Sequence, residues 1–150
     1  MLKGNLLHAP IFEALGRAGH GSKILIADGN YPASTTLGPN ATLVCLNLAP
    51  GVVNATQVLE ALLSVIPVEA ARVMQYLREG PYALSEDPPI WRAFHQILTA
   101  DCPAIALEEI ERFAFYEAAA QPDVCLAIQT ADQRIYANLM LTIGVVMPKT

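Results

Sequence analysis

The sequence predicts a single α/β domain over residues 1–150, built as a three-layer α/β/α arrangement around a mostly parallel or mixed central sheet. Short apolar runs alternate with amphipathic segments along the whole chain, which is the order of strands and helices in α/β proteins. A chain of 150 residues is long enough for one sizeable core, and no repeat, linker or low-complexity segment divides it.

The first third of the chain predicts one helix followed by one strand. Pro10 fits the first turn of a helix, because its missing N–H is not needed there. Apolar side chains then recur at helical spacing, and Gly19 is expected to end the helix in a left-handed conformation. Residues 24–27 form a continuous apolar run, typical of a strand that is covered on both faces. The Gly-Asn-Tyr-Pro turn at residues 29–32 ends it.

The middle of the chain predicts a second strand and a capped helix. The strand covers residues 42–48. Asn54 and Gln57 have the spacing of a capping box, which predicts a helix over residues 55–66. Residues 69–79 could be either a helix or a strand. Their apolar residues have helical spacing, but the segment is short enough to be a strand.

The last part of the chain predicts two further helices and three strands. A helix over residues 85–99 opens with Ser85 and two prolines and has an apolar stripe. The remaining expected elements are a strand at residues 104–107, a helix at 110–120, and strands at 124–130 and 136–146. The last two strands are close enough in sequence to pair antiparallel.

Composition indicates a self-associating protein. Charged residues make up 15% of the chain, against roughly 25% in soluble domains, while 53% are apolar. Because so few charges cover a surface poorly, we expect a homo-oligomer. A net charge of −5 argues against nucleic acid as a partner.

No motif indicates a cofactor or a metal. The chain has no phosphate-binding glycine loop and no nucleophile elbow, and its three histidines lack metal-ligand spacing. The three cysteines form no C-x-x-C pair, and we expect buried free thiols in a reducing cytoplasm. No run reaches the roughly 18 apolar residues of a membrane span, and the N-terminus lacks an export signal. We therefore expect a soluble cytoplasmic protein.

His20 and Asp28 flank the strand at residues 24–27, and each has two interpretations. His20 is either an exposed turn residue between two glycines or a proton donor and acceptor near neutral pH. Asp28 either caps a turn around Asn30 or binds a ligand, because ligands of α/β sheets lie outside the carboxyl ends of strands.

Two later segments carry further candidates. Arg112 stands among aromatic residues in "RFAFYE", where it either faces water or donates to sugar hydroxyls beside an aromatic wall, to which Tyr116 would contribute. Tyr136 and Asn138 are two residues apart, so on a strand they share a face. They are either surface groups or partners in one pocket.

Taken in order, GHG, AD-x-N-[FY]-PA, RFAFYE and Y-x-N resemble the sugar mutarotases of the RbsD/FucU family over nearly the whole chain. RFAFYE resembles the L-fucose mutarotase branch in particular. The resemblance implies a cofactor-free isomerase that interconverts the α and β anomers of a free monosaccharide, L-fucose. It implies His20 as proton donor and Asp28, Arg112, Tyr136 and Asn138 as substrate-binding residues. It also implies a strand near Val73 and ring assemblies, which in some members are decamers of two stacked pentamers.

Some features keep alternatives open. The chain is longer than typical members, with additions before the helix near Ser85 and around residues 121–123, and the longer middle loop bears on substrate choice. A D-ribose-type pyranase, a non-catalytic sugar-binding protein linked to sugar uptake, and a purely structural oligomer are the other interpretations. His20 and Asp28 lie seven residues of extended chain apart, roughly 23–25 Å at full stretch. Either the turn at Gly21 folds His20 back, or a neighbouring subunit supplies one of the two groups.

Overall fold

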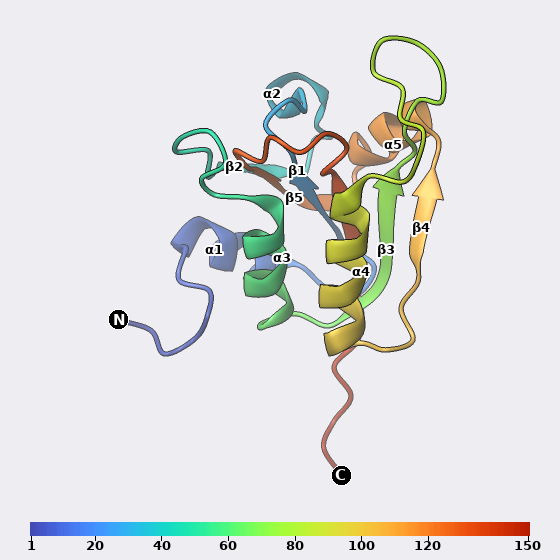
Figure 1. Ribbon diagram of the computed structural model, residues 1–150. Helices are drawn as coiled ribbons and strands as arrows, with labels where there is room; N and C mark the ends of the chain where they lie inside the picture. Colours follow the sequence, from blue (N-terminus) through green and yellow to red (C-terminus); the bar gives the residue numbers. More distant parts are fainter.

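The computed structural model covers residues 1–150 and contains one six-stranded sheet in the order β2-β5-β1-β6-β3-β4 (Figure 1). Five strands run in one direction, and β6 runs antiparallel to both of its neighbours. The sheet is therefore mixed and mostly parallel, as predicted. The strands are β1 (Lys23–Ala27), β2 (Thr42–Cys45), β3 (Val68–Met74), β4 (Leu107–Ile110), β5 (Val124–Gln129) and β6 (Leu139–Ile143).

Helices cover both faces of the sheet, which confirms the three-layer arrangement (Figure 1). One face carries three helices and the larger apolar cluster, and the other carries α5 and the very short α2 with a smaller cluster. The helices are α1 (Ala9–Arg17), α2 (Ala33–Thr36), α3 (Ala55–Leu63), α4 (Pro89–Asp101) and α5 (Arg112–Ala119).

Strand β1 shows why a continuous apolar run was needed in the sequence. Ile24 and Ile26 belong to the larger cluster, whereas Leu25 and Ala27 belong to the smaller one. All four side chains are fully buried. Because successive side chains of a strand point to opposite faces, a strand covered on both faces must be apolar at every position.

The predicted capping box begins α3. The Asn54 side chain accepts a hydrogen bond from the Gln57 backbone N–H at 3.0 Å, and the Gln57 side chain accepts one from the Asn54 N–H at 3.0 Å. Two otherwise unpaired N–H groups at the helix start are satisfied in this way. Val58, Leu59 and Leu62 are buried, as the helical spacing predicted.

Several predicted boundaries are wrong. The helix before β1 ends in Ala18 with extended backbone, and the left-handed glycine is Gly21, with φ of +81°, rather than Gly19. Helix α4 begins at Pro89 and not at Ser85, because Pro88, with φ of −55° and ψ of 130°, lies outside the helical region. The strand expected at 104–107 lies at Leu107–Ile110 instead, where its two glutamates face solvent on the edge of the sheet.

The order of the strands corrects two further expectations. Residues 68–74 are strand β3, which resolves the open choice for residues 69–79. β5 and β6 are not paired with each other, because β1 lies between them. Strand β6 pairs antiparallel with β1 and β3 and begins only at Leu139.

Much apolar surface stays uncovered in the single chain. Exposed large apolar side chains include Leu48 at 83%, Val146 at 77%, Met147 at 75% and Phe113 at 68%. Cys45 is also exposed and the other two cysteines are half-buried, so the expectation of three buried thiols is wrong. None of the helices has the length and apolar character needed to cross a membrane.

Candidate functional site

A cleft of about 390 Å³ opens at the carboxyl end of β1, next to the start of the antiparallel strand β6. Ligands of open α/β sheets bind at this kind of edge. Five of the six predicted site residues line it, and only His20 does not. The lining residues are Asp28, Asn30, Tyr31, Met74, Tyr82, Arg112, Tyr116, Ile135, Tyr136 and Asn138.

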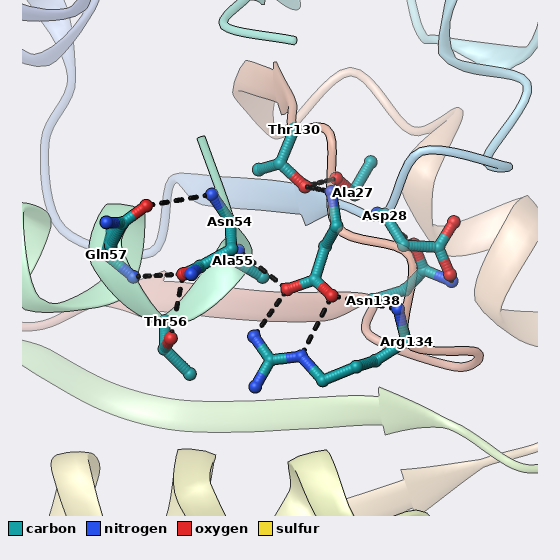
Figure 2. A network of polar contacts seen from close by, with 10 residues as sticks. Ala27, Asp28, Asn54, Ala55, Thr56, Gln57, Thr130, Arg134 and Asn138 are labelled. Carbon is teal, nitrogen blue, oxygen red and sulfur yellow. Dashed lines mark hydrogen bonds and ion pairs between the residues drawn. The ribbon is translucent and has the colours of Figure 1, made fainter. Parts of the chain in front are cut away.

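Asp28 and Asn138 form a reciprocal pair at the bottom of the cleft. The Asp28 backbone N–H donates to Asn138 Oδ1 at 2.8 Å, and Asn138 Nδ2 donates to Asp28 Oδ2 at 3.1 Å. Asp28 Oδ1 accepts a third bond from the Asn30 N–H at 2.9 Å, which is the turn-capping bond considered for this residue. Asp28 and Asn138 are 4% and 5% exposed, so both side chains are held in one orientation. Both are drawn in Figure 2.

Burial raises the pKa of the Asp28 carboxyl above its usual value. Hydrogen bonds from the Asn30 backbone and the Asn138 amide oppose the rise, and the negative charge of Asp132 adds to it. A carboxylate in a place that penalises its charge binds hydroxyl donors strongly, because such donors replace the lost water.

Arg112 and Tyr116 enter the cleft from α5. Glu111 caps this helix by accepting hydrogen bonds from the N–H groups of Phe113 and Ala114, which places Arg112 at the first helical position. The guanidinium makes no hydrogen bond within the chain and lies 6.0 Å from the centre of the Tyr116 ring. Its donors are therefore free for ligand hydroxyls beside an aromatic surface. Tyr116 in turn lies 5.3 Å from the Tyr31 ring.

Tyr136 lines the cleft, but not from a strand as expected. It belongs to the connection between β5 and β6, and its φ of +59° is rare for a residue with a bulky side chain. Its hydroxyl accepts from the Leu77 N–H at 2.9 Å and donates to the Tyr82 carbonyl at 3.2 Å. The single phenolic proton of Tyr136 is therefore used inside the chain.

His20 lies at the opposite end of β1 from the cleft. The four steps from Lys23 to Ala27 alone span roughly 13 Å of extended chain. His20 is on the far side of Lys23, where its Nε2 lies 3.0 and 2.9 Å from the two carboxylate oxygens of Glu69 at the start of β3. Its side chain is 59% exposed. The turn at Gly21 does not fold His20 back, so one subunit does not unite His20 with Asp28.

The connection between β5 and β6 is held by Asp132, a residue that the sequence reasoning missed. Asp132 is 2% exposed and accepts from the Ala55 N–H at 2.9 Å and from Arg134 Nε at 2.9 Å. Figure 2 shows Arg134 directed toward this network, next to the start of α3. Burial disfavours the Asp132 charge, but these donors outweigh it and lower the pKa of the carboxyl. The network fixes the segment that carries Tyr136 and Asn138.

Other cleft residues also escaped the sequence analysis. Tyr31 lies inside the AD-x-N-Y-P motif, so the motif itself was a usable signal. Met74, Tyr82 and Ile135 carry no local signal, because they come from three separate segments. No group of three or more His, Cys, Asp or Glu side chains converges in the chain.

Comparisons with known proteins show similarity over almost the whole chain. The model of the RbsD / FucU transport protein family matches residues 1–146. A human protein named fucose mutarotase is 33% identical over 146 residues, which cover 93% of this chain and 90% of that protein.

A second relative and a solved structure extend the comparison. A protein of Streptomyces coelicolor named D-ribose pyranase is 30% identical over 145 residues, 97% of this chain and 98% of its own. The crystal structure of FucU from Bifidobacterium longum is 30% identical with a TM-score of 0.80, over 93% of this chain and 95% of that chain. The similarity therefore spans the whole domain and includes the elements that form the cleft.

Proposed function

The chain belongs to the RbsD / FucU transport protein family, and from this premise we propose that it is a sugar mutarotase that interconverts the α and β anomers of L-fucose or a similar free monosaccharide. The observation that carries the proposal is the cleft at the carboxyl end of β1, with a buried carboxylate, a buried amide and an unpaired guanidinium. These groups bind several hydroxyls at once, and the aromatic rings beside them suit the C–H faces of a sugar.

The chemistry needs proton transfer and little else. Ring opening adds a proton to the ring oxygen and removes one from the anomeric hydroxyl, and closure on the other carbonyl face reverses both transfers. One positioned acid/base group contributes roughly 10²–10⁴-fold to such a step. The reaction changes no oxidation state, so we propose that it runs without a cofactor.

His20 is the proposed proton donor and acceptor. Glu69 bonds Nε2 of the imidazole and so orients the ring, while Nδ1 makes no hydrogen bond within the chain. The remaining predicted residues bind the sugar in two ways. Asp28, Asn138 and Arg112 hold hydroxyls, and the Tyr116 and Tyr136 rings wall the cleft.

We further propose that His20 comes from a neighbouring subunit of a cytoplasmic homo-oligomer. His20 and the cleft lie at opposite ends of β1, so an acid/base role requires a second copy of the chain. The low charge content and the exposed apolar side chains support self-association. Because the partner is an identical chain, every subunit donates one His20 and offers one cleft.

The experiment is saturation-transfer NMR, which measures exchange between the α and β anomers of L-fucose, with D-ribose as comparison sugar. We expect the wild-type protein to accelerate exchange and His20→Ala to lose roughly 10²-fold or more of that acceleration. If His20→Ala exchanges the sugar at the wild-type rate, the role given to His20 is wrong.

The same measurement separates the alternatives. Faster exchange of D-ribose than of L-fucose identifies a pyranase, which the Streptomyces coelicolor relative makes the natural second candidate. Binding of L-fucose with no exchange above buffer identifies a sugar-binding protein, and no binding at all leaves a structural oligomer.

A further inference from the structure

Residues 77–84 form a tied loop at the mouth of the cleft. The Leu84 N–H donates to the Leu77 carbonyl at 3.0 Å and closes the loop at its base. Inside it, the Ala83 N–H donates to the Gly80 carbonyl at 3.2 Å, and Gly80 has a φ of +94°, which glycine adopts without strain.

Tyr82 is the loop residue that lines the cleft. It is 71% exposed, so its ring is free to be covered by a ligand. The polar groups Asp28 and Asn138 are buried at the bottom of the cleft, whereas Tyr82 lies exposed at its surface. A sugar whose hydroxyls reach Asp28 and Asn138 therefore turns apolar C–H groups toward the aromatic side.

Tyr136 connects this loop to the rest of the site. Its hydroxyl bonds both the Leu77 N–H and the Tyr82 carbonyl, so one side chain holds two points of the loop. Its ring in turn packs edge-to-face with Tyr76 at 6.2 Å, and Tyr76 packs against Trp91 at 5.5 Å. The position of Tyr82 is thus set from the core through Tyr136.

From these contacts we propose that Tyr82 determines specificity by packing against the apolar face and the 6-methyl group of a 6-deoxy sugar, and that Tyr136 is the positioning residue that holds Tyr82 over the cleft. The proposal rests on the proposed mutarotase function. It assigns the Tyr136 hydroxyl to the loop and leaves only its ring for the sugar.

The test uses two sugars that differ at one group, since D-arabinopyranose is L-fucopyranose without the methyl group. Anomer exchange of both is measured by NMR over a range of sugar concentrations. We expect Tyr82→Ala to lower the L-fucose to D-arabinose ratio of kcat/KM about 4-fold, the value for one buried methyl-sized group. The lower kcat/KM for L-fucose is expected to come from a higher KM with an unchanged kcat, because the methyl group takes no part in the chemistry. Tyr82→Phe keeps the ring and is expected to keep the ratio.

Tyr136→Phe tests the positioning role. It removes both loop bonds but keeps the ring, so the sugar ratio falls in the same direction and amide hydrogen exchange at Leu77 becomes faster. The double variant Tyr82→Ala/Tyr136→Phe is expected to have the same L-fucose to D-arabinose ratio as Tyr82→Ala alone. The reason is that both changes remove the same contact, the one between the Tyr82 ring and the sugar.

Three results overturn the proposal. An unchanged ratio in Tyr82→Ala, even with slower exchange of both sugars, removes the specificity role of Tyr82. Additive losses in the double variant show that Tyr136 acts independently of Tyr82. If the wild-type protein exchanges neither sugar, the mutarotase function itself is wrong, and the proposal is rejected with it.

Discussion

Two inactive variants that damage different halves of the proposed site are expected to restore activity when they share an oligomer. His20→Ala removes the proton donor but keeps an intact cleft, and Asp28→Asn damages the cleft but keeps His20. The two residues lie at opposite ends of β1, so neither change reaches the other group. A site made from two subunits can therefore combine the intact half of each variant.

The expected magnitude follows from the pairing of subunits. In a random mixture of equal amounts, about half of the clefts belong to the His20→Ala subunit, and about half of those face a neighbour that still has His20. About one quarter of the wild-type activity is therefore restored, since two independent halves must coincide. A site contained within one subunit restores none.

The assay is co-expression of equal amounts of the two variants with different affinity tags, followed by L-fucose exchange measured by NMR on the unselected mixture. Purification of a separate sample over both tags verifies that mixed oligomers form. Each variant alone gives the background. The matched control is a mixture of Asp28→Asn with Arg112→Ala, because both residues line the same cleft and no mixture provides an undamaged one.

Verified mixed oligomers with no more activity than either parent would refute the shared site. Restored activity in the control mixture would contradict the placement of Asp28 and Arg112 in one cleft. A protein that stays monomeric at assay concentration, yet loses exchange in His20→Ala, would also contradict the reasoning, because a lone subunit keeps His20 away from the cleft.

Two further predictions concern the support of the site. Asp132→Ala leaves the buried Ala55 N–H without its partner and frees Arg134, so chemical denaturation is expected to show a loss of about 3 kcal/mol at neutral pH. The pKa of Asp132 in the folded protein lies below its ordinary value of 3.8. The stability contributed by the ionised carboxylate is therefore complete above pH 3.8 and disappears as the pH falls through the folded pKa. If the difference in stability between wild type and Asp132→Ala does not change with pH, the ionic role is wrong. Asn54→Ala removes the capping box of α3 and is expected to cost about 1 kcal/mol in the same assay, while Asn54→Ser, which still caps, costs less. Equal losses of stability in Asn54→Ala and Asn54→Ser would show that the cap contributes nothing.

Elements with a strong local cause were predictable from the sequence. Strand β1 needed apolar side chains on both faces, and α3 begins at a capping box whose four hydrogen-bonding groups lie within four residues. The ends of elements were less predictable. Helix α4 was expected to begin at Ser85, but the chain from there to Pro88 stays outside the helix.

Half of the residues that line the cleft were predictable from the sequence, but their arrangement in space was not. One cleft is lined by Asp28, Arg112, Tyr116, Tyr136 and Asn138. Tyr136 and Asn138 were expected to share a face of one strand, but β6 begins only after Asn138. The predicted residues meet because β1, α5 and the connection before β6 converge at one edge of the sheet. Met74 and Tyr82 join them from elements far away in sequence, which no local pattern predicts.

The sequence by itself determined the three-layer fold and supplied the candidate groups of the proposed site, because burial pattern, capping and motifs are all properties of the order of residues along the chain. Only the tertiary structure decided how those groups are arranged. It put His20 and Asp28 at opposite ends of β1, and it bound the Tyr136 hydroxyl to the loop that carries Tyr82. Both facts depend on distances between segments remote in sequence, and such distances arise only when the strands are ordered in the sheet and the loops are packed on its edge.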